Sequence, residues 1–89
     1  MAYQIELSTE VVRQLQSFDP QHTKRITKFL QDRVAKLDNP RSIGQALHGS
    51  RLGEFWKYRV GDYRLISKLE DDRLLVLVLQ IGHRKEIYR

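Results

Sequence analysis

The chain has 89 residues, of which 40% are hydrophobic and 30% are charged, a composition typical of one small globular domain. Its 16 lysine and arginine residues outnumber its 11 acidic residues, and the net charge of +5 favours polyanionic partners such as nucleic acid or an acidic protein. There is no cysteine, no apolar run of the roughly 18 residues that a membrane helix needs, and no pattern of a secretory signal at the N-terminus, so we expect a cytoplasmic protein without disulfides.

The first 40 residues contain one strand pattern and two helix patterns. Residues 3–7, YQIEL, alternate apolar and polar side chains and predict a strand. Ser8 is a suitable N-cap for a helix, whose apolar spacing continues as far as Asp19. Asp19 is a suitable cap and Pro20 is well placed in the first turn of a second, amphipathic helix, which we expect to end near position 39. The short connection predicts an antiparallel helix pair packed on a sheet.

The second half of the chain carries three strand patterns at hairpin spacing. Residues 41–54 are rich in glycine and serine and predict a loop. We predict strands over Glu54–Val60, Tyr63–Leu69 and Leu74–Ile81, with Gly61-Asp62 as a two-residue turn in which glycine supplies a positive φ. The third strand is apolar at consecutive positions, which is typical of a central strand.

Together these elements predict a single α+β domain over residues 1–89. We expect a two-layer sandwich, in which the N-terminal strand and the antiparallel helix pair pack on a mostly antiparallel four-stranded sheet.

The hairpin register sorts the side chains onto two faces. A two-residue turn places Arg59 opposite Arg64 and Lys57 opposite Ile66. One face suits burial under the helices and holds Trp56, Tyr58, Val60, Tyr63, Leu65 and Leu69. The other face is predicted to be open and to carry four cations with two apolar side chains between them and no acid: Lys57, Arg59, Arg64, Lys68, Phe55 and Ile66.

Directly opposed arginines repel each other and destabilise a sheet. An anion held between Arg59 and Arg64 would remove the repulsion, and the guanidinium group matches phosphate oxygens in bidentate geometry. We therefore predict a phosphate site on this face. The alternative is a solvated outer face, on which salt screens the charges.

The C-terminal segment IGHRKEIYR adds basic and aromatic residues, namely His83, Arg84, Lys85, Tyr88 and Arg89. Such interleaving is typical of sites for single-stranded nucleic acid, because cations follow the phosphates and rings stack on the bases. The alternative is a charged, frayed end of the chain.

The segments LHGSRLGEFWKYRVGDYRLI and VLVLQIGHRKEIY together resemble the RelE toxins of the RelE/ParE superfamily, and the resemblance covers nearly the whole chain. It implies the microbial RNase-like RelE fold and the toxin half of a type II toxin-antitoxin pair. Such a toxin is a ribosome-dependent endoribonuclease, which cuts messenger RNA codons in the ribosomal A site and inhibits translation. The resemblance implies a reaction without metal or cofactor, in which the ribose 2′-hydroxyl attacks the adjacent phosphate.

The resemblance also implies site residues. The basic pair on the second strand corresponds to Lys57 and Arg59, the arginine after the hairpin to Arg64, the late arginine to Arg84, and the terminal tyrosine to Tyr88. Arginine stays protonated at neutral pH, so it suits the stabilisation of negative charge rather than proton transfer. RNA contacts are expected from Lys57, Arg59, Lys68, Lys85, Arg89 and Phe55.

The general base is left open between several residues. Lys57 is one candidate, because neighbouring cations favour a neutral amine, and His83 is another, because imidazole titrates near neutral pH. Tyr88 would stack on a base or position the 2′-hydroxyl. Some relatives use glutamate or histidine, and Glu54 and His48 are the further candidates of that kind.

Two other functions fit the same residues. ParE proteins share the fold and poison DNA gyrase, although the complete set of basic residues and tyrosine favours RNA cleavage. The third possibility is a noncatalytic module that binds RNA or an acidic protein. For a toxin, the resemblance implies three partners: a RelB-like antitoxin with an acidic neutralising segment, the ribosome and messenger RNA. Contact with operator DNA is expected only through the antitoxin, and no contact with a membrane is expected.

Overall fold

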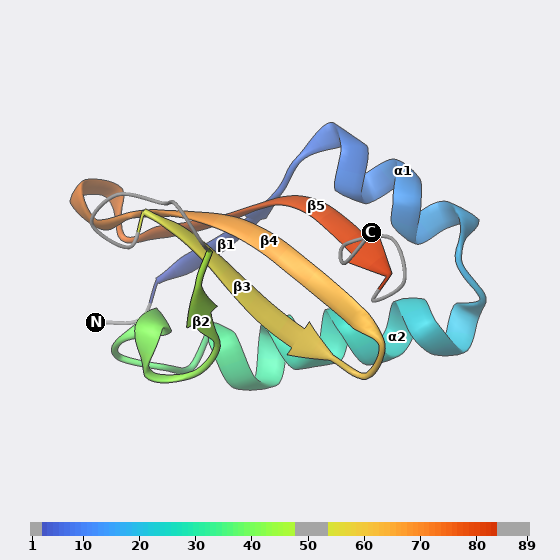
Figure 1. Cartoon of the computed structure of the whole chain (residues 1–89), viewed down its shortest axis with the longest axis horizontal. Helices are drawn as coiled ribbons and strands as arrows, with labels where there is room; N and C mark the ends of the chain where they lie inside the picture. The colour runs from blue at the N-terminus through green and yellow to red at the C-terminus, as the bar shows by residue number, and fades with distance from the viewer. Residues whose placement is uncertain (1–2, 48–53, 84–89) are drawn as a thin grey trace.

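The computed structural model describes residues 3–47 and 54–83, which form two layers (Figure 1). One layer is a five-stranded sheet in the order β1-β5-β4-β3-β2. Its strands are β1 (Gln4–Leu7), β2 (Gln45–Ala46), β3 (Phe55–Val60), β4 (Tyr63–Glu70) and β5 (Leu75–His83). The other layer holds the helices α1 (Thr9–Ser17) and α2 (Pro20–Phe29). In the described part of the chain, no helix is long and apolar enough to span a membrane.

The two layers confirm the predicted α+β sandwich, and the sheet is mostly antiparallel, as expected. β1 runs parallel to β5, and the other neighbours are antiparallel. The predicted number of four strands was wrong, because β2 pairs Gln45 with Lys57 and Ala46 with Trp56 inside the segment expected to be a loop. Two residues are too few to show the alternation on which strand prediction depends.

Both helices begin at the predicted caps. Ser8 Oγ accepts a hydrogen bond from the Val11 N–H at 3.1 Å, and the Asp19 carboxylate accepts one from the Gln21 N–H at 2.9 Å. In Figure 1, α1 runs toward the right of the view and α2 returns toward the left behind β3 and β4. The helices therefore cover one face of the sheet and leave the other face to the viewer.

The second helix ends earlier than predicted. After Phe29 the chain makes a π-helical turn over Leu30–Val34, in which the Ala35 N–H donates to the Leu30 carbonyl at 2.8 Å. This wider turn holds an extra residue and ends the regular helix. Asn39 then caps a short 3-10 helix, Pro40–Ser42, which leads to β2.

The core lies between the helices and the facing side of the sheet. Its buried apolar side chains are Val11, Leu15, Ile26, Leu30, Val34, Tyr58, Val60, Leu65, Leu69, Val76, Val78 and Ile81. β5 lies between β1 and β4, as the predicted central strand.

A β-bulge in β5 controls which residues face the helices. Ile66 pairs with Gln80 and Ser67 pairs with Val78, so Leu79 has no partner across β4. The extra residue shifts the alternation by one position, which brings Val78 and Ile81 onto the same buried side.

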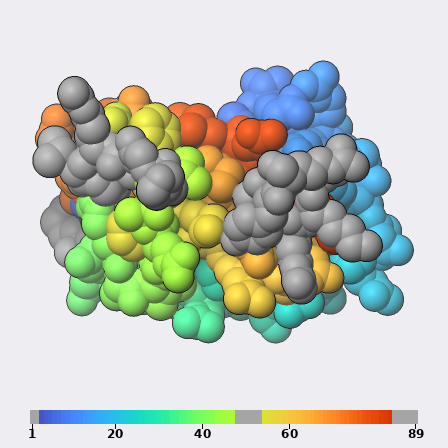
Figure 2. Space-filling view, viewed as in Figure 1, coloured from blue at the N-terminus to red at the C-terminus, as the bar shows by residue number. Residues whose placement is uncertain are grey.

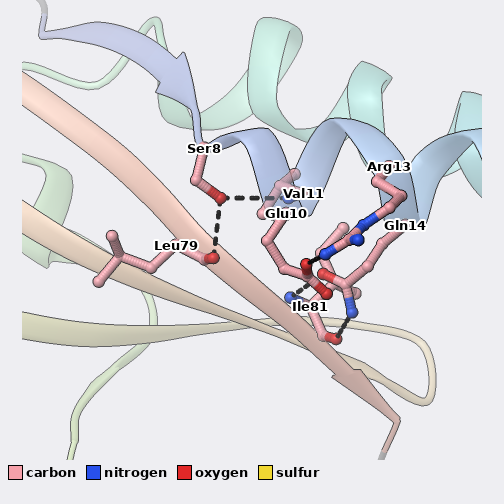
Figure 3. Close-up of polar contacts among 7 residues, drawn as sticks. All are labelled: Ser8, Glu10, Val11, Arg13, Gln14, Leu79 and Ile81. Carbon is pink, nitrogen blue, oxygen red and sulfur yellow. Dashed lines mark hydrogen bonds and ion pairs between the residues drawn. The ribbon is translucent and has the colours of Figure 1, made fainter.

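Side chains of α1 continue the pairing of β5 beyond the end of β1 (Figure 3). β1 pairs with β5 only as far as Val78. Further along, Ser8 Oγ donates to the Leu79 carbonyl at 2.8 Å. The Gln14 amide bonds Ile81 twice, because Nε2 donates to its carbonyl at 2.6 Å and Oε1 accepts from its N–H at 2.9 Å. Gln14 therefore takes the place of a neighbouring strand and holds α1 against the sheet.

Replacing Gln14 with alanine is expected to lower the free energy of unfolding by about 1–3 kcal/mol. The substitution removes the hydrogen-bond partners of both the N–H and the carbonyl of part-buried Ile81. Urea denaturation measures this loss. Gln16→Ala is the matched control, since Gln16 is exposed on the same helix and its replacement should change stability by less than about 0.5 kcal/mol. Equal stability of the two variants would contradict the strand-like role of Gln14.

An exposed polar network joins β1 to the turn after β4. The Tyr3 hydroxyl donates to Asp71 Oδ1 at 2.6 Å, and the Arg41 guanidinium donates to both carboxylate oxygens of Asp71, at 2.8 and 3.2 Å. The bonds from Arg41, and then that from Tyr3, lower the pKa of the Asp71 carboxyl group. The Arg41 guanidinium also lies 6.0 Å from the centre of the Trp56 ring, so the network supports the segment that leads to β2.

Asp71→Asn should therefore change how stability depends on pH. Because the folded pKa of Asp71 is lowered, its charge contributes stability above an unfolded pKa of about 4, and this stability disappears as the pH falls through the folded pKa. The side chain is half exposed and solvent screens it, so the contribution is about 0.2–1 kcal/mol at pH 7. Chemical denaturation of wild type and variant between neutral and strongly acidic pH would test this. A stability difference that stays constant below pH 4 would contradict the role of the Asp71 charge.

Candidate phosphate-binding site

The β3–β4 hairpin has the predicted register. Val60 pairs with Tyr63, Arg59 with Arg64, and Lys57 with Ile66. Gly61 has a φ of +59°, whereas the φ of Asp62 is not positive. This combination matches a type II′ turn. The turn therefore sets two arginines directly opposite each other.

A pocket of about 260 Å³ gathers three of the predicted site residues. It is lined by Gly44, Gln45, Lys57, Arg59 and Arg64. Within the described ranges, the lining has three cations and no carboxylate. Figure 2 turns this face of the sheet toward the viewer, with β2 in green beside β3 in yellow. Such a concentration of positive charge favours an anion.

Arg64 is buried, with 4% of its surface exposed, whereas the sequence placed it on an open face. Alternation along a strand assigns a face but not its exposure, and β4 is an interior strand with neighbours on both sides. The guanidinium of Arg64 donates to the carbonyl oxygens of Gly61 at 3.2 Å and Tyr63 at 3.1 Å. Arg59, by contrast, is exposed. The pocket thus combines one guanidinium fixed against the turn with one that a ligand can reach.

Gly44 brings the wall of the pocket close to β3. Its φ is +83°, and a Cβ atom there would lie 2.6 Å from both the Lys57 carbonyl oxygen and Trp56 Nε1. The Trp56 indole donates to the Ile43 carbonyl at 2.7 Å and holds this approach in place. Sequence reasoning missed Gly44 and Gln45 as pocket residues, because a glycine-rich segment predicts a turn and does not show which distant backbone it will meet.

His83 lies on the other side of the sheet from the pocket. It pairs with Tyr63, and its ring meets the Tyr63 ring edge-on with 5.6 Å between centroids. Arg64 pairs instead with Gly82, on the outer face. The structure therefore does not bring His83 together with the three cations.

Lys68 and Phe55, which pair with each other, lie further along the outer face. The Lys68 ammonium is 3.4 Å from a carboxylate oxygen of Glu54, so one of the four cations on the face predicted to carry no acid pairs with a carboxylate. Glu54 comes just before β3 and reaches the neighbouring strand. Lys68 also lines a different hollow, which Asp71 shares, and it is separate from the pocket of Lys57.

The remaining predicted site residues, Arg84, Lys85, Tyr88 and Arg89, and the alternative His48, lie outside the described residues. In residues 3–47 and 54–83, no group of three or more His, Asp or Glu side chains could hold a metal ion.

Tyr58 stands between Lys57 and Arg59 in the sequence but faces the core. Its side chain is fully buried, and its hydroxyl donates to the Pro40 carbonyl at 2.6 Å. Burial raises the pKa of Tyr58 above the usual range of a tyrosine. This tyrosine therefore supports the hairpin and has no part in the pocket.

Comparison with known proteins gives consistent results. The sequence model of the ParE toxin family, described as the ParE toxin of the type II toxin-antitoxin system parDE, matches residues 5–88. Toxin RelG of Mycobacterium tuberculosis (strain ATCC 25618 / H37Rv) is 28% identical over 89 residues, which cover 100% of this chain and 99% of the relative.

Two solved toxin-antitoxin complexes contain similar chains. In the RelBE2 complex from Mycobacterium tuberculosis, the similar chain has a TM-score of 0.79 and 24% identity, with coverage of 94% of this chain and 100% of that chain. In the archaeal RelE-RelB complex from Pyrococcus horikoshii OT3, the values are 0.72 and 26%, with coverage of 94% and 97%.

Proposed function

Because the chain belongs to the ParE toxin family, and is a RelE-type toxin of a type II toxin-antitoxin system, we propose that it is a ribosome-dependent endoribonuclease that cuts messenger RNA. The observation that carries the proposal is the pocket of Lys57, Arg59 and Arg64, which offers three cations to one phosphate group. Two arginines opposed across a hairpin repel each other, and a phosphate group bound between them would offset that repulsion.

The pocket fits a reaction in which the 2′-oxygen bonds to phosphorus and the bond from phosphorus to the 5′-oxygen breaks. The 2′-hydroxyl proton passes to a base, and the departing 5′-oxygen takes up a proton. Negative charge grows on the phosphoryl oxygens during this exchange. Arg64 is already fixed by Gly61 and Tyr63, so it stabilises that charge without reorganisation. Arg59 is accessible, binds the incoming phosphate and also stabilises the charge that develops on its oxygens.

We assign the base to Lys57 rather than to His83, because only Lys57 lines the pocket. In this role the amine of Lys57, in its unprotonated form, accepts the 2′-hydroxyl proton beside the two guanidinium groups. Arg84 and Tyr88 complete the proposal as a further phosphate ligand and as the residue that positions the nucleotide.

We further propose a cognate antitoxin with an acidic segment. Both complexes described above pair a similar toxin chain with an antitoxin. An acidic segment that folds onto the toxin would neutralise the net charge of +5 and cover the pocket.

Primer extension on messages after induction of the protein, with and without ongoing translation, tests the proposal. We expect breaks within translated codons that disappear when translation is blocked. Intact messages in cells that stop growing would contradict RNA cleavage.

Gyrase inhibition is the second candidate, because the family model that matches residues 5–88 describes ParE toxins. That function predicts DNA breaks and an SOS response with intact messages, so the same induced cultures distinguish the two candidates.

A further inference from the structure

Three hollows share walls around the β3–β4 hairpin. The pocket described above shares Arg59 with a second hollow of about 450 Å³ between α2 and the end of β3. The second hollow shares Arg25 and Gly61 with a third, of about 240 Å³, beside Tyr63. The hollows therefore lie next to one another in a row from the outer face of the sheet, past the turn, to the helix side, and we name this row the hairpin groove.

The edge of β3 leaves this path open. β2 pairs only with Trp56 and Lys57, and in the described part of the chain no strand covers the edge of β3 from Tyr58 onward. The second hollow lies along this edge, with Val60 and Gly61 on the β3 side. A chain that enters the pocket has a route around the turn.

The groove is basic beyond the pocket. Arg25, Lys28, Arg33 and Arg59 line the second hollow, against Asp32 as its acidic residue among those described. In the third hollow, Arg25 is joined by His22 and His83, with Asp62 at the turn. Positive charge along a row of adjacent hollows favours an extended polyanion over a single small anion.

Aromatic rings lie beside these cations. In the third hollow, the Tyr63 and His22 rings meet at 5.5 Å between centroids, and Phe18, outside the lining of the hollow, supports the Tyr63 ring at 5.0 Å. In the second, Phe29 lies with the Arg33 guanidinium 5.9 Å from its ring centre. Rings next to cations suit a single-stranded nucleic acid, whose bases stack while its phosphates pair with charges, whereas an acidic peptide requires only the cations.

We propose that the hairpin groove holds the RNA strand that continues from the phosphate in the pocket, with one base against His22, Tyr63 and His83. The inference rests on the proposed function, because the pocket supplies the starting point of the strand. It adds a substrate subsite on α2 that the catalytic cations do not include.

Binding of uncleavable RNA tests the groove. The probes are a 2′-O-methyl RNA of about nine nucleotides, a length within the range of known single-strand sites, and the corresponding trinucleotide, which fills the pocket alone. The doubly substituted variant Arg25→Ala with Lys28→Ala removes two groove cations. Lys24→Ala with Lys36→Ala is the matched control, because it removes the same charge from exposed positions that line none of the three hollows.

The groove variant should bind the longer RNA about tenfold more weakly than wild type, and the slope of log affinity against log salt should fall by about 1.4 for two lost phosphate contacts. Its affinity for the trinucleotide should be unchanged, and the control should match wild type with both probes. His22→Ala, at the far end, should weaken binding of the longer RNA by about fivefold or more through lost stacking.

Equal affinity of the groove variant and the control for the longer RNA would overturn the inference. A second result would also overturn it: polyglutamate of matching charge binds wild type as tightly as RNA does and loses affinity equally in all groove variants. That result indicates a surface for an acidic protein. Binding does not require cleavage, so the primer extension test judges the nuclease separately, and the two failures are distinguishable.

Discussion

Arg59→Ala is expected to lower the rate of RNA cleavage about 10²- to 10³-fold without lowering the stability of the protein. The magnitude is typical of the loss of one group that stabilises developing charge. Stability should stay the same or rise slightly, because the Arg59 side chain is exposed and its removal relieves the repulsion from Arg64. Single-turnover cleavage of messenger RNA on programmed ribosomes gives the rate, and urea denaturation gives the stability.

Arg64→Ala should show a similar loss of rate together with a loss of about 1 kcal/mol of stability. The difference arises because Arg64 is buried and its guanidinium also bonds the carbonyl oxygens of Gly61 and Tyr63. Arg13→Ala is the control for both variants, since Arg13 is exposed and pairs with Glu10 on α1. If Arg59→Ala cleaves as fast as Arg13→Ala, the pocket is not the site of cleavage.

Gly44→Ala should lower the free energy of unfolding by about 2–3 kcal/mol. A φ of +83° costs an L-residue about 1–2 kcal/mol, and the added Cβ would collide with Trp56 Nε1 and break its bond to Ile43, for about 1 kcal/mol more. Urea or thermal denaturation measures the loss. RNA cleavage should also fall, because the collision with the Lys57 carbonyl displaces the wall of the pocket.

Gly61→Ala is the matched comparison for Gly44. Its φ of +59° carries a similar backbone cost, but its Cβ would meet only the flexible end of Arg25, at 3.0 Å. We therefore expect a loss of about 1–2 kcal/mol. If Gly44→Ala destabilises the protein no more than Gly61→Ala does, the close approach to Trp56 and Lys57 carries no energetic weight.

The parts of the fold that follow from local rules could be predicted from the sequence. The two-residue turn and the period of two determine the pairing of Arg59 with Arg64, and the caps at Ser8 and Asp19 determine where the helices begin. The grouping of Lys57 with the two arginines follows from the same register.

The remaining features depend on contacts between distant segments. β2 has two residues and exists because Gly44 lets its segment approach Trp56 and Lys57. The burial of Arg64 depends on its neighbours in the sheet, which a strand pattern does not show. The position of His83 depends on the bulge at Leu79, which has no signal in a run of consecutive apolar residues.

The bulge also decides what stands across from Arg64. If β5 had no bulge and Leu79 paired with Ile66, then Ile81 would pair with this arginine, and polar Gln80 would face the helices. Because Leu79 is the bulged residue, Arg64 pairs with Gly82, which has a hydrogen atom where a branched side chain would otherwise stand. The irregularity at one point in the sheet thus keeps bulk away from the guanidinium on which the proposed chemistry depends.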